Sequence, residues 1–163
     1  MPNTKLAVLV LAVVASACYE ASVPLGQPGS VPLDPAIVGE WQCLPPPADK
    51  SDGRATLVVM PFDERQYFAE WASEGDRPDR YRVYGTRLGP DVVYNVHQLP
   101  AGEGGWAFFR YRIDPAGVLY LSMVKDEAMK GLDQKAALDA IRSRAGDEKI
   151  YMPVAVCTRG RSG

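Results

Sequence analysis

The chain has 163 residues and a formal net charge of −2 at pH 7. Its 20 acidic residues outnumber its 18 basic residues, which gives no electrostatic reason to expect a nucleic-acid partner. The length is sufficient for one domain with its own apolar core.

The first 17 residues predict a secretory signal peptide. Lys5 precedes an apolar block at 6–14, and the small residues Ala15, Ser16 and Ala17 follow it. This order of charged, apolar and small regions is typical of such signals. The block is shorter than the roughly 20 apolar residues that a transmembrane helix needs, so we expect no permanent span here.

The small residues directly before Cys18 resemble the lipobox of bacterial lipoproteins. The resemblance implies a diacylglycerol on the Cys18 sulfur, cleavage just before it, and acyl chains such as palmitate that anchor the protein in a membrane. Tyr19 is not the Asp that the family uses for inner-membrane retention. We therefore expect an envelope lipoprotein, at the outer membrane and facing the periplasm or the cell surface. Ordinary signal cleavage after Ala17, without lipidation, is the alternative.

Residues 18–34 are rich in Pro, Gly and Ser and nearly uncharged, which predicts an extended tether rather than part of a core. The folded domain is expected at 35–160. Asp34 and Pro35 suit the start of a single helical turn that runs through Ile37.

Short β-rich runs divided by turn residues follow along the chain. They predict strands at 39–43, 55–62, 66–72, 80–88, 91–99, 106–113, 118–124 and 149–159. Asp114 to Gly117 has the sequence of a type I turn. Pro153 implies a bulge or an edge position in the last strand.

The pattern changes to a helical period at 133–146. Asp133 can cap the start of a helix there, and an apolar stripe follows at Ala137, Leu138, Ile141 and Ala145. With many of the strands about ten residues apart, the sequence predicts a mainly-β fold, an antiparallel barrel or sandwich. We favour an eight-stranded barrel with one helix before the last strand.

Two cysteines remain once Cys18 is assigned to lipid. Cys43 and Cys157 fall in the first and last predicted strands, which are neighbours in a closed barrel, so a disulfide between them would join its ends. In the chain-entropy model, a disulfide that closes such a long loop stabilises the folded state by ~4–5 kcal/mol. Two buried thiols or a metal pair are the alternatives, although no nearby histidine supports zinc.

A short turn followed by Gly39-Glu40-Trp41 resembles the G-x-W start of lipocalins and lipocalin-like barrels. In that family the tryptophan closes the base of the barrel, and an arginine near the end of the last strand stacks on it. The resemblance assigns these positions to Trp41 and Arg159 and implies a barrel that binds a small apolar ligand.

The sequence offers little catalytic chemistry. His97 is the only histidine, and it lies in a predicted strand beside polar neighbours. No nucleophile triad, metalloprotease motif or nucleotide-binding loop is present, so we expect no enzyme activity, no cofactor and no metal.

Aromatic residues crowd the central strands, where they either fill the barrel or line a ligand cavity. The candidate lining residues are Tyr67, Trp71, Tyr94, Phe109 and Tyr111. Two functions remain open at this point. One is binding of a small apolar ligand, and the other is docking or inhibition of an envelope protein partner, which a packed interior with an exposed aromatic patch would favour.

Overall fold

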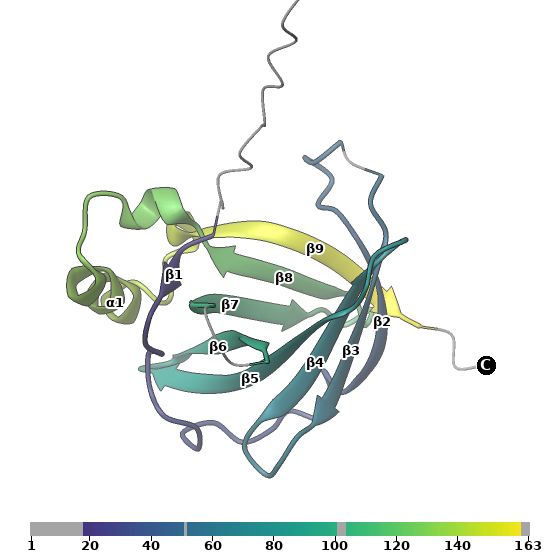
Figure 1. The fold of residues 1–163 in the computed structure, drawn as a ribbon, viewed down its shortest axis with the longest axis horizontal. Helices are drawn as coiled ribbons and strands as arrows, with labels where there is room; N and C mark the ends of the chain where they lie inside the picture. The colour runs from purple at the N-terminus through teal and green to yellow at the C-terminus, as the bar shows by residue number, and fades with distance from the viewer. Residues whose placement is uncertain (1–17, 51, 101–103, 161–163) are drawn as a thin grey trace, which may run out of the picture.

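The computed structural model describes residues 18–50, 52–100 and 104–160, so the predicted signal peptide lies outside the described residues. Within these ranges, eight antiparallel strands close into a barrel (Figure 1). The strands are β2 (Gly39–Leu44), β3 (Ala55–Pro61), β4 (Tyr67–Ser73), β5 (Asp79–Leu88), β6 (Asp91–Leu99), β7 (Trp106–Ile113), β8 (Leu119–Val124) and β9 (Tyr151–Arg159). Each pairs with the next along the chain, and β9 returns to β2. The expected barrel is confirmed.

The predicted disulfide joins the first and last strands of the barrel. Cys43 on β2 lies directly opposite Cys157 on β9, with their Cα atoms 4.0 Å apart, and the two sulfurs are bonded. Both side chains are buried in the barrel interior. The disulfide therefore closes a loop that contains all the remaining strands of the barrel, β3 to β8.

Local turn chemistry explains two details of the sheet. At the β7–β8 hairpin, Gly117 has a φ of 80° and donates to the Asp114 carbonyl, as the turn sequence predicts. In β9, the register against β8 shifts after Pro153, so Val154 is an extra residue. The predicted bulge is confirmed.

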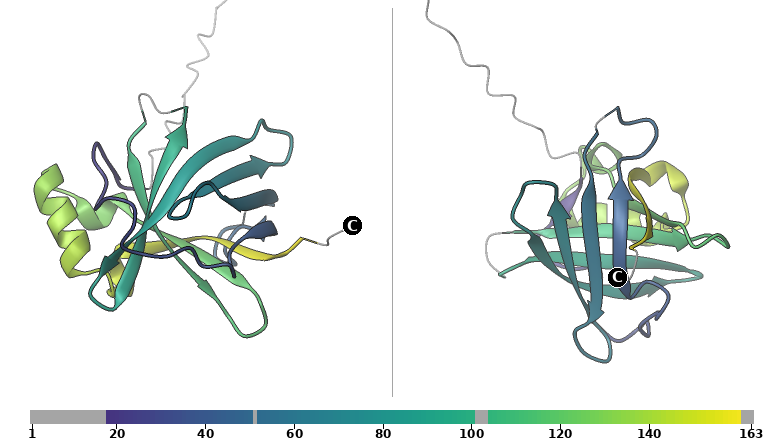
Figure 2. Two further views of the ribbon diagram at one scale, coloured as in Figure 1. Left: turned by 90° about the horizontal axis from the view of Figure 1, so that it is seen from below. Right: turned by 90° about the vertical axis from the view of Figure 1, so that its right-hand side faces the viewer.

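The N-terminal segment corrects the expectation of a free tether at 18–34. Glu20–Ala21 forms the short strand β1, which pairs with the start of β7, and Tyr19 donates its backbone N–H to the Val124 carbonyl at the end of β8. Figure 2 shows the segment following the outside of the barrel before β2 begins. Ala21, Leu25 and Val31 are each at least 92% buried.

Specific contacts hold this segment in place. The backbone N–H of Leu25 donates to Asn95 Oδ1 at 2.7 Å, and Asn95 in turn donates to Thr86 Oγ1. Val31 packs so closely on Gly85 that a Cβ at that glycine would approach the Val31 side chain to 3.0 Å. Composition alone missed this docking because a few well-placed apolar residues are enough to attach a proline-rich segment.

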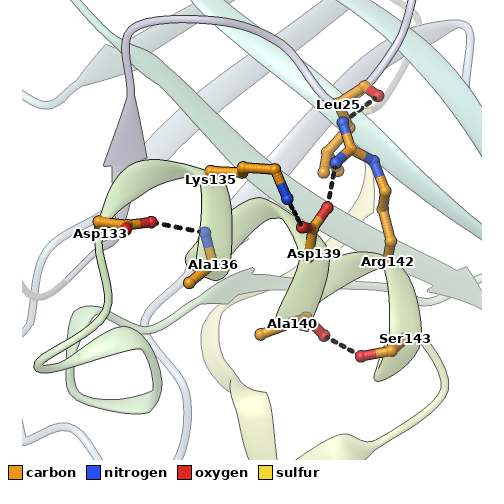
Figure 3. Close-up of polar contacts among 8 residues, drawn as sticks. All are labelled: Leu25, Asp133, Lys135, Ala136, Asp139, Ala140, Arg142 and Ser143. Carbon is orange, nitrogen blue, oxygen red and sulfur yellow. Dashed lines mark hydrogen bonds and ion pairs between the residues drawn. The ribbon is translucent and has the colours of Figure 1, made fainter.

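Helix α1 (Gln134–Ser143) covers the outside of the barrel at β6 and β7. Its apolar stripe packs on the outward side chains Val93 and Phe108, which are fully buried. Asp133 accepts a hydrogen bond from the Ala136 backbone, so the predicted cap is confirmed (Figure 3). Arg142 also reaches the Leu25 carbonyl, which links the helix to the N-terminal segment (Figure 3).

Two short 3₁₀ turns flank this helix, Asp126–Met129 and Glu148–Ile150. They carry Met129 and Ile150 into the same outer cluster. No helix in the described ranges is both long and apolar enough to cross a membrane.

Candidate ligand-binding cavity

The barrel interior contains an apolar cavity of about 480 Å³ that opens to solvent. This volume lies in the range of small-molecule sites in proteins. Most of its wall comes from alternate residues of β3 to β8, because successive side chains of a strand point to opposite faces. The aliphatic part of the wall includes Leu57, Val59, Ala69, Val83, Val96, Ala107, Leu121 and Met123.

All five aromatic residues that the sequence nominates contribute to this wall, namely Tyr67, Trp71, Tyr94, Phe109 and Tyr111. Tyr81, which was not among them, joins them from β5. Alternation could have found it, because Tyr81 lies directly opposite the inward-facing Ala69 in the β4–β5 ladder. These aromatic residues come from the neighbouring strands β4, β5, β6 and β7, and the small residues Ala69 and Ala107 belong to the same wall.

One end of the barrel is closed by Trp41, which is 1% exposed. The Arg159 guanidinium lies 4.0 Å from the centre of its ring, as the lipocalin resemblance implies. Arg159 also donates to the carbonyl oxygens of Ala36 and Val38. Gly39 has a φ of 131°, and a Cβ there would lie 2.5 Å from Arg159 Nη1, so the arrangement requires glycine at this position.

A polar cluster lies beside this closed end. Tyr94 donates its hydroxyl to the Tyr111 oxygen at 3.3 Å, and Tyr111 donates to Asp34 Oδ2 at 2.8 Å. The Asp34 backbone N–H donates to the Tyr67 oxygen at 2.5 Å. Tyr67 and Tyr111 thus bond Asp34 directly, and Tyr94 is linked to it through Tyr111. Asp34 also accepts from the Ala36 N–H in the turn through Ile37.

Burial raises the pKa of all these phenols. For Tyr111 burial is the largest cause, followed by its hydrogen bond with Tyr94, and together with the nearby Asp34 carboxyl they raise its pKa far above the usual value. Burial also raises the pKa of Tyr67 and Tyr94. The hydroxyls therefore stay protonated, so that Tyr111 acts as a donor to Asp34.

The N-terminal residues line the opposite, open end. Cys18 and Glu20 contribute to the cavity wall there, together with Gln98, Gly104 and Gly105. The backbone of Cys18 pairs with that of Lys125, just after β8, in an isolated antiparallel β-bridge. Burial raises the pKa of Tyr81, with smaller contributions from Asp79 and from Cys18, which lies near it. The residue predicted to carry lipid therefore borders the mouth of the cavity.

Charged side chains of the central strands lie on the outer surface. Arg110 donates to the Ala145 carbonyl and to Glu148, so its guanidinium sits in the outer layer even though the residue contributes to the wall. His97 stacks on Trp106 with ring centres 4.6 Å apart, and its Nε2 is 3.1 Å from the Gly104 carbonyl oxygen.

A second hollow of about 570 Å³ lies at the rim, beneath the β2–β3 connection. Its wall includes Asp49, Arg54, Glu74 and Asp76, and it is more open than the interior cavity. The described side chains include no group of three or more His, Cys, Asp or Glu residues arranged to hold a metal ion. The interior cavity is therefore the better candidate site.

Comparisons with protein-family models, with curated proteins and with solved structures give no match for this chain. The functional argument therefore rests on the geometry of the barrel and on the residues that line it.

Sequence reasoning missed the contribution of Asp34. It was assigned only to the local turn, which it does form, because nothing in the sequence indicates that this turn would lie against the inner tyrosines of β4, β6 and β7. The aspartate-to-tyrosine contacts span 33 and 77 residues. Only the three-dimensional path of the chain brings them together.

Proposed function

We propose that the protein is a lipid-anchored, non-catalytic lipoprotein of the bacterial cell envelope that binds a small apolar ligand inside a lipocalin-like barrel. The observation that carries the proposal is the open cavity of about 480 Å³, with its aromatic and aliphatic wall. A barrel of this size can be filled by its own side chains or can hold one small ligand. Here space remains, which favours ligand binding over the alternative role of docking an envelope protein partner.

The position of Cys18 fits this proposal. Glu20 and Ala21 are already paired with β7, so a lipid on Cys18 would have almost no tether between it and the barrel. Because Cys18 borders the cavity mouth, acyl chains there would hold the mouth close to the bilayer. An apolar ligand could then pass between membrane and cavity with little exposure to water. The outer membrane remains our proposed location.

Native mass spectrometry of the exported protein tests the ligand proposal. The full gene is expressed with Cys18→Ser, so that no detergent is needed, and the mature protein is recovered from the periplasm. We expect a non-covalent adduct that leaves on collisional activation and is absent from the denatured spectrum. A protein that carries no adduct, and takes up none from an envelope lipid extract, would contradict the proposal.

The wild-type protein, extracted separately in detergent, tests the anchor. Its denatured mass should exceed that of residues 18–163 by a diacylglyceryl group and one further acyl chain. An unmodified mass that begins at Cys18 would show ordinary signal cleavage instead.

A further inference from the structure

The cavity is apolar along its walls but has a directional hydrogen-bond chain at its closed end. Tyr94 donates to Tyr111, and Tyr111 donates to the Asp34 carboxylate. Each tyrosine oxygen can donate one hydrogen bond and accept two. Tyr94 uses its only donor on Tyr111, and no described protein group donates to the Tyr94 oxygen. Its lone pairs are therefore available to a molecule in the cavity.

The direction of the chain determines what this end can bind. The Asp34 carboxylate is the final acceptor, and it polarises the two hydroxyls so that the Tyr94 oxygen becomes a better acceptor. The hydroxyls cannot all reverse, because a carboxylate only accepts and Tyr111 is its donor. A ligand that reaches Tyr94 must therefore bring a hydrogen-bond donor. A group that can only accept hydrogen bonds, such as a carboxylate, would face the lone pairs of the Tyr94 oxygen and could form no hydrogen bond with it.

The charges around the cavity act in the same direction. Asp34 lies behind Tyr111 at the closed end, and Glu20 lines the open end. Arg110, the only basic residue among the lining positions that the structure describes, points its guanidinium outward to Ala145 and Glu148. Both ends of the interior thus carry a carboxylate, while no basic head group faces inward from the described wall. This field favours neutral and cationic ligands over anionic ones.

We infer that the ligand is a small apolar, ring-sized molecule whose leading end carries a hydrogen-bond donor, an amine or a hydroxyl, which binds Tyr94 at the closed end. This inference rests on the proposed ligand-binding function and specifies the chemical class of the ligand. The aromatic wall of Tyr67, Trp71 and Phe109 holds the apolar body. An ammonium head gains further from the ring faces near it.

A competition experiment with matched compounds tests this inference. The exported protein with Cys18→Ser is saturated with the neutral fluorescent probe N-phenylnaphthylamine. 4-Phenylbutylamine, 4-phenylbutanol and 5-phenylpentanoate then compete for the cavity; each carries its head group on the same phenylbutyl chain. We expect the amine to displace the probe at a concentration about tenfold lower than the carboxylate, with the alcohol between them, as one charge-assisted hydrogen bond implies.

Variants locate the preference within the cavity. Tyr111→Phe interrupts the chain and should reduce the preference for the amine over the carboxylate severalfold, and Tyr94→Phe should do the same. The charges of Asp34 and Glu20 remain in both variants and should maintain a smaller preference. Asp34→Asn removes the charge but keeps an acceptor, so it should weaken amine binding more than alcohol binding. Tyr120→Phe is the matched control, because Tyr120 also bonds an aspartate, Asp114, but does not line the cavity. Its ratio should equal that of the wild type.

The outcomes separate the two proposals. If the probe binds and all three compounds displace it equally, or the carboxylate does so best, the inference is wrong and the ligand-binding function stands. If neither the probe nor any compound binds, both fail. If the preference persists undiminished in Tyr111→Phe and in Tyr94→Phe while both bind the probe, the hydrogen-bond chain is not its source.

Discussion

Arg159 shows how one side chain can secure the closed end of the barrel. Its guanidinium covers the Trp41 ring and holds the carbonyls of Ala36 and Val38, which belong to the turn before β2. That turn follows Asp34 directly, and Asp34 receives the tyrosine hydrogen bond of the cavity. A solvent-exposed residue at the closed end of the barrel thus supports the position of a polar group inside it.

We predict that Arg159→Ala lowers the free energy of unfolding by about 1–3 kcal/mol, because it removes a cation–π contact and two hydrogen bonds to backbone carbonyls. Urea denaturation followed by tryptophan fluorescence measures the change. Arg112→Ala is the matched control, because Arg112 is also exposed and stacks on a ring, Tyr120, at 4.1 Å, but among the described residues it donates to no backbone carbonyl, whereas Arg159 donates to two. Equal losses in the two variants would show that Arg159 has no special role.

At the scale of elements, the sequence predicts the strands well because their alternation and turn residues are local signals. The β7 strand at 106–113, the Asp114–Gly117 turn and the Asp133 cap all lie where the pattern indicates. The disulfide was predictable too, since closure of the barrel brings the first and last strands together. These features need only the residues nearby or the simplest closed topology.

The N-terminal segment was not predictable in the same way. Its proline and glycine content describes the local chain, while its docking depends on Asn95, which lies 70 residues further along. The polar cluster at Asp34 escaped prediction for the same reason. Both features depend on hydrogen bonds between residues far apart in the chain. Such bonds leave no periodic pattern in the sequence, unlike the apolar residues of a strand or helix.

Asn95 should therefore control how firmly the N-terminal segment is held. Asn95→Leu has a similar volume but leaves the Leu25 N–H without its acceptor in a buried position, at a cost of about 1–3 kcal/mol. We expect amide exchange at Leu25 to accelerate by roughly tenfold or more, since 1.4 kcal/mol corresponds to a factor of ten. Hydrogen exchange with mass spectrometry on peptides covering residues 20–31 measures it.

Ser22→Ala provides the comparison for this segment. The Ser22 hydroxyl donates to Gln134 Oε1 at an exposed position, and the backbone N–H of residue 22 donates to the same oxygen. Ser22→Ala removes only the hydroxyl bond, so it should change exchange little. If Asn95→Leu exchanges like the wild type, the hydrogen bond between Leu25 and Asn95 does not control how firmly the segment is held.

The whole molecule has two apolar regions that share the same strands. The outer cluster, under α1 and the N-terminal segment, is tightly filled, and Val93, Phe108 and Ile141 have no exposed surface there. The inner region is filled only toward Trp41 and keeps an open cavity along the rest of the barrel. Stability can therefore come from the outer packing, the closed base and the disulfide, which leaves the interior available for a ligand.

The central claim is that a ligand enters this cavity, and a titration with N-phenylnaphthylamine tests it most directly. Ala107 lines the cavity, so Ala107→Phe places a ring in the space a ligand would occupy. Ala72→Phe adds the same ring to the outward face of β4. We predict saturable binding to the wild type and to Ala72→Phe, and affinity at least tenfold weaker for Ala107→Phe. Equal binding by all three proteins would place the probe outside the barrel and contradict the account.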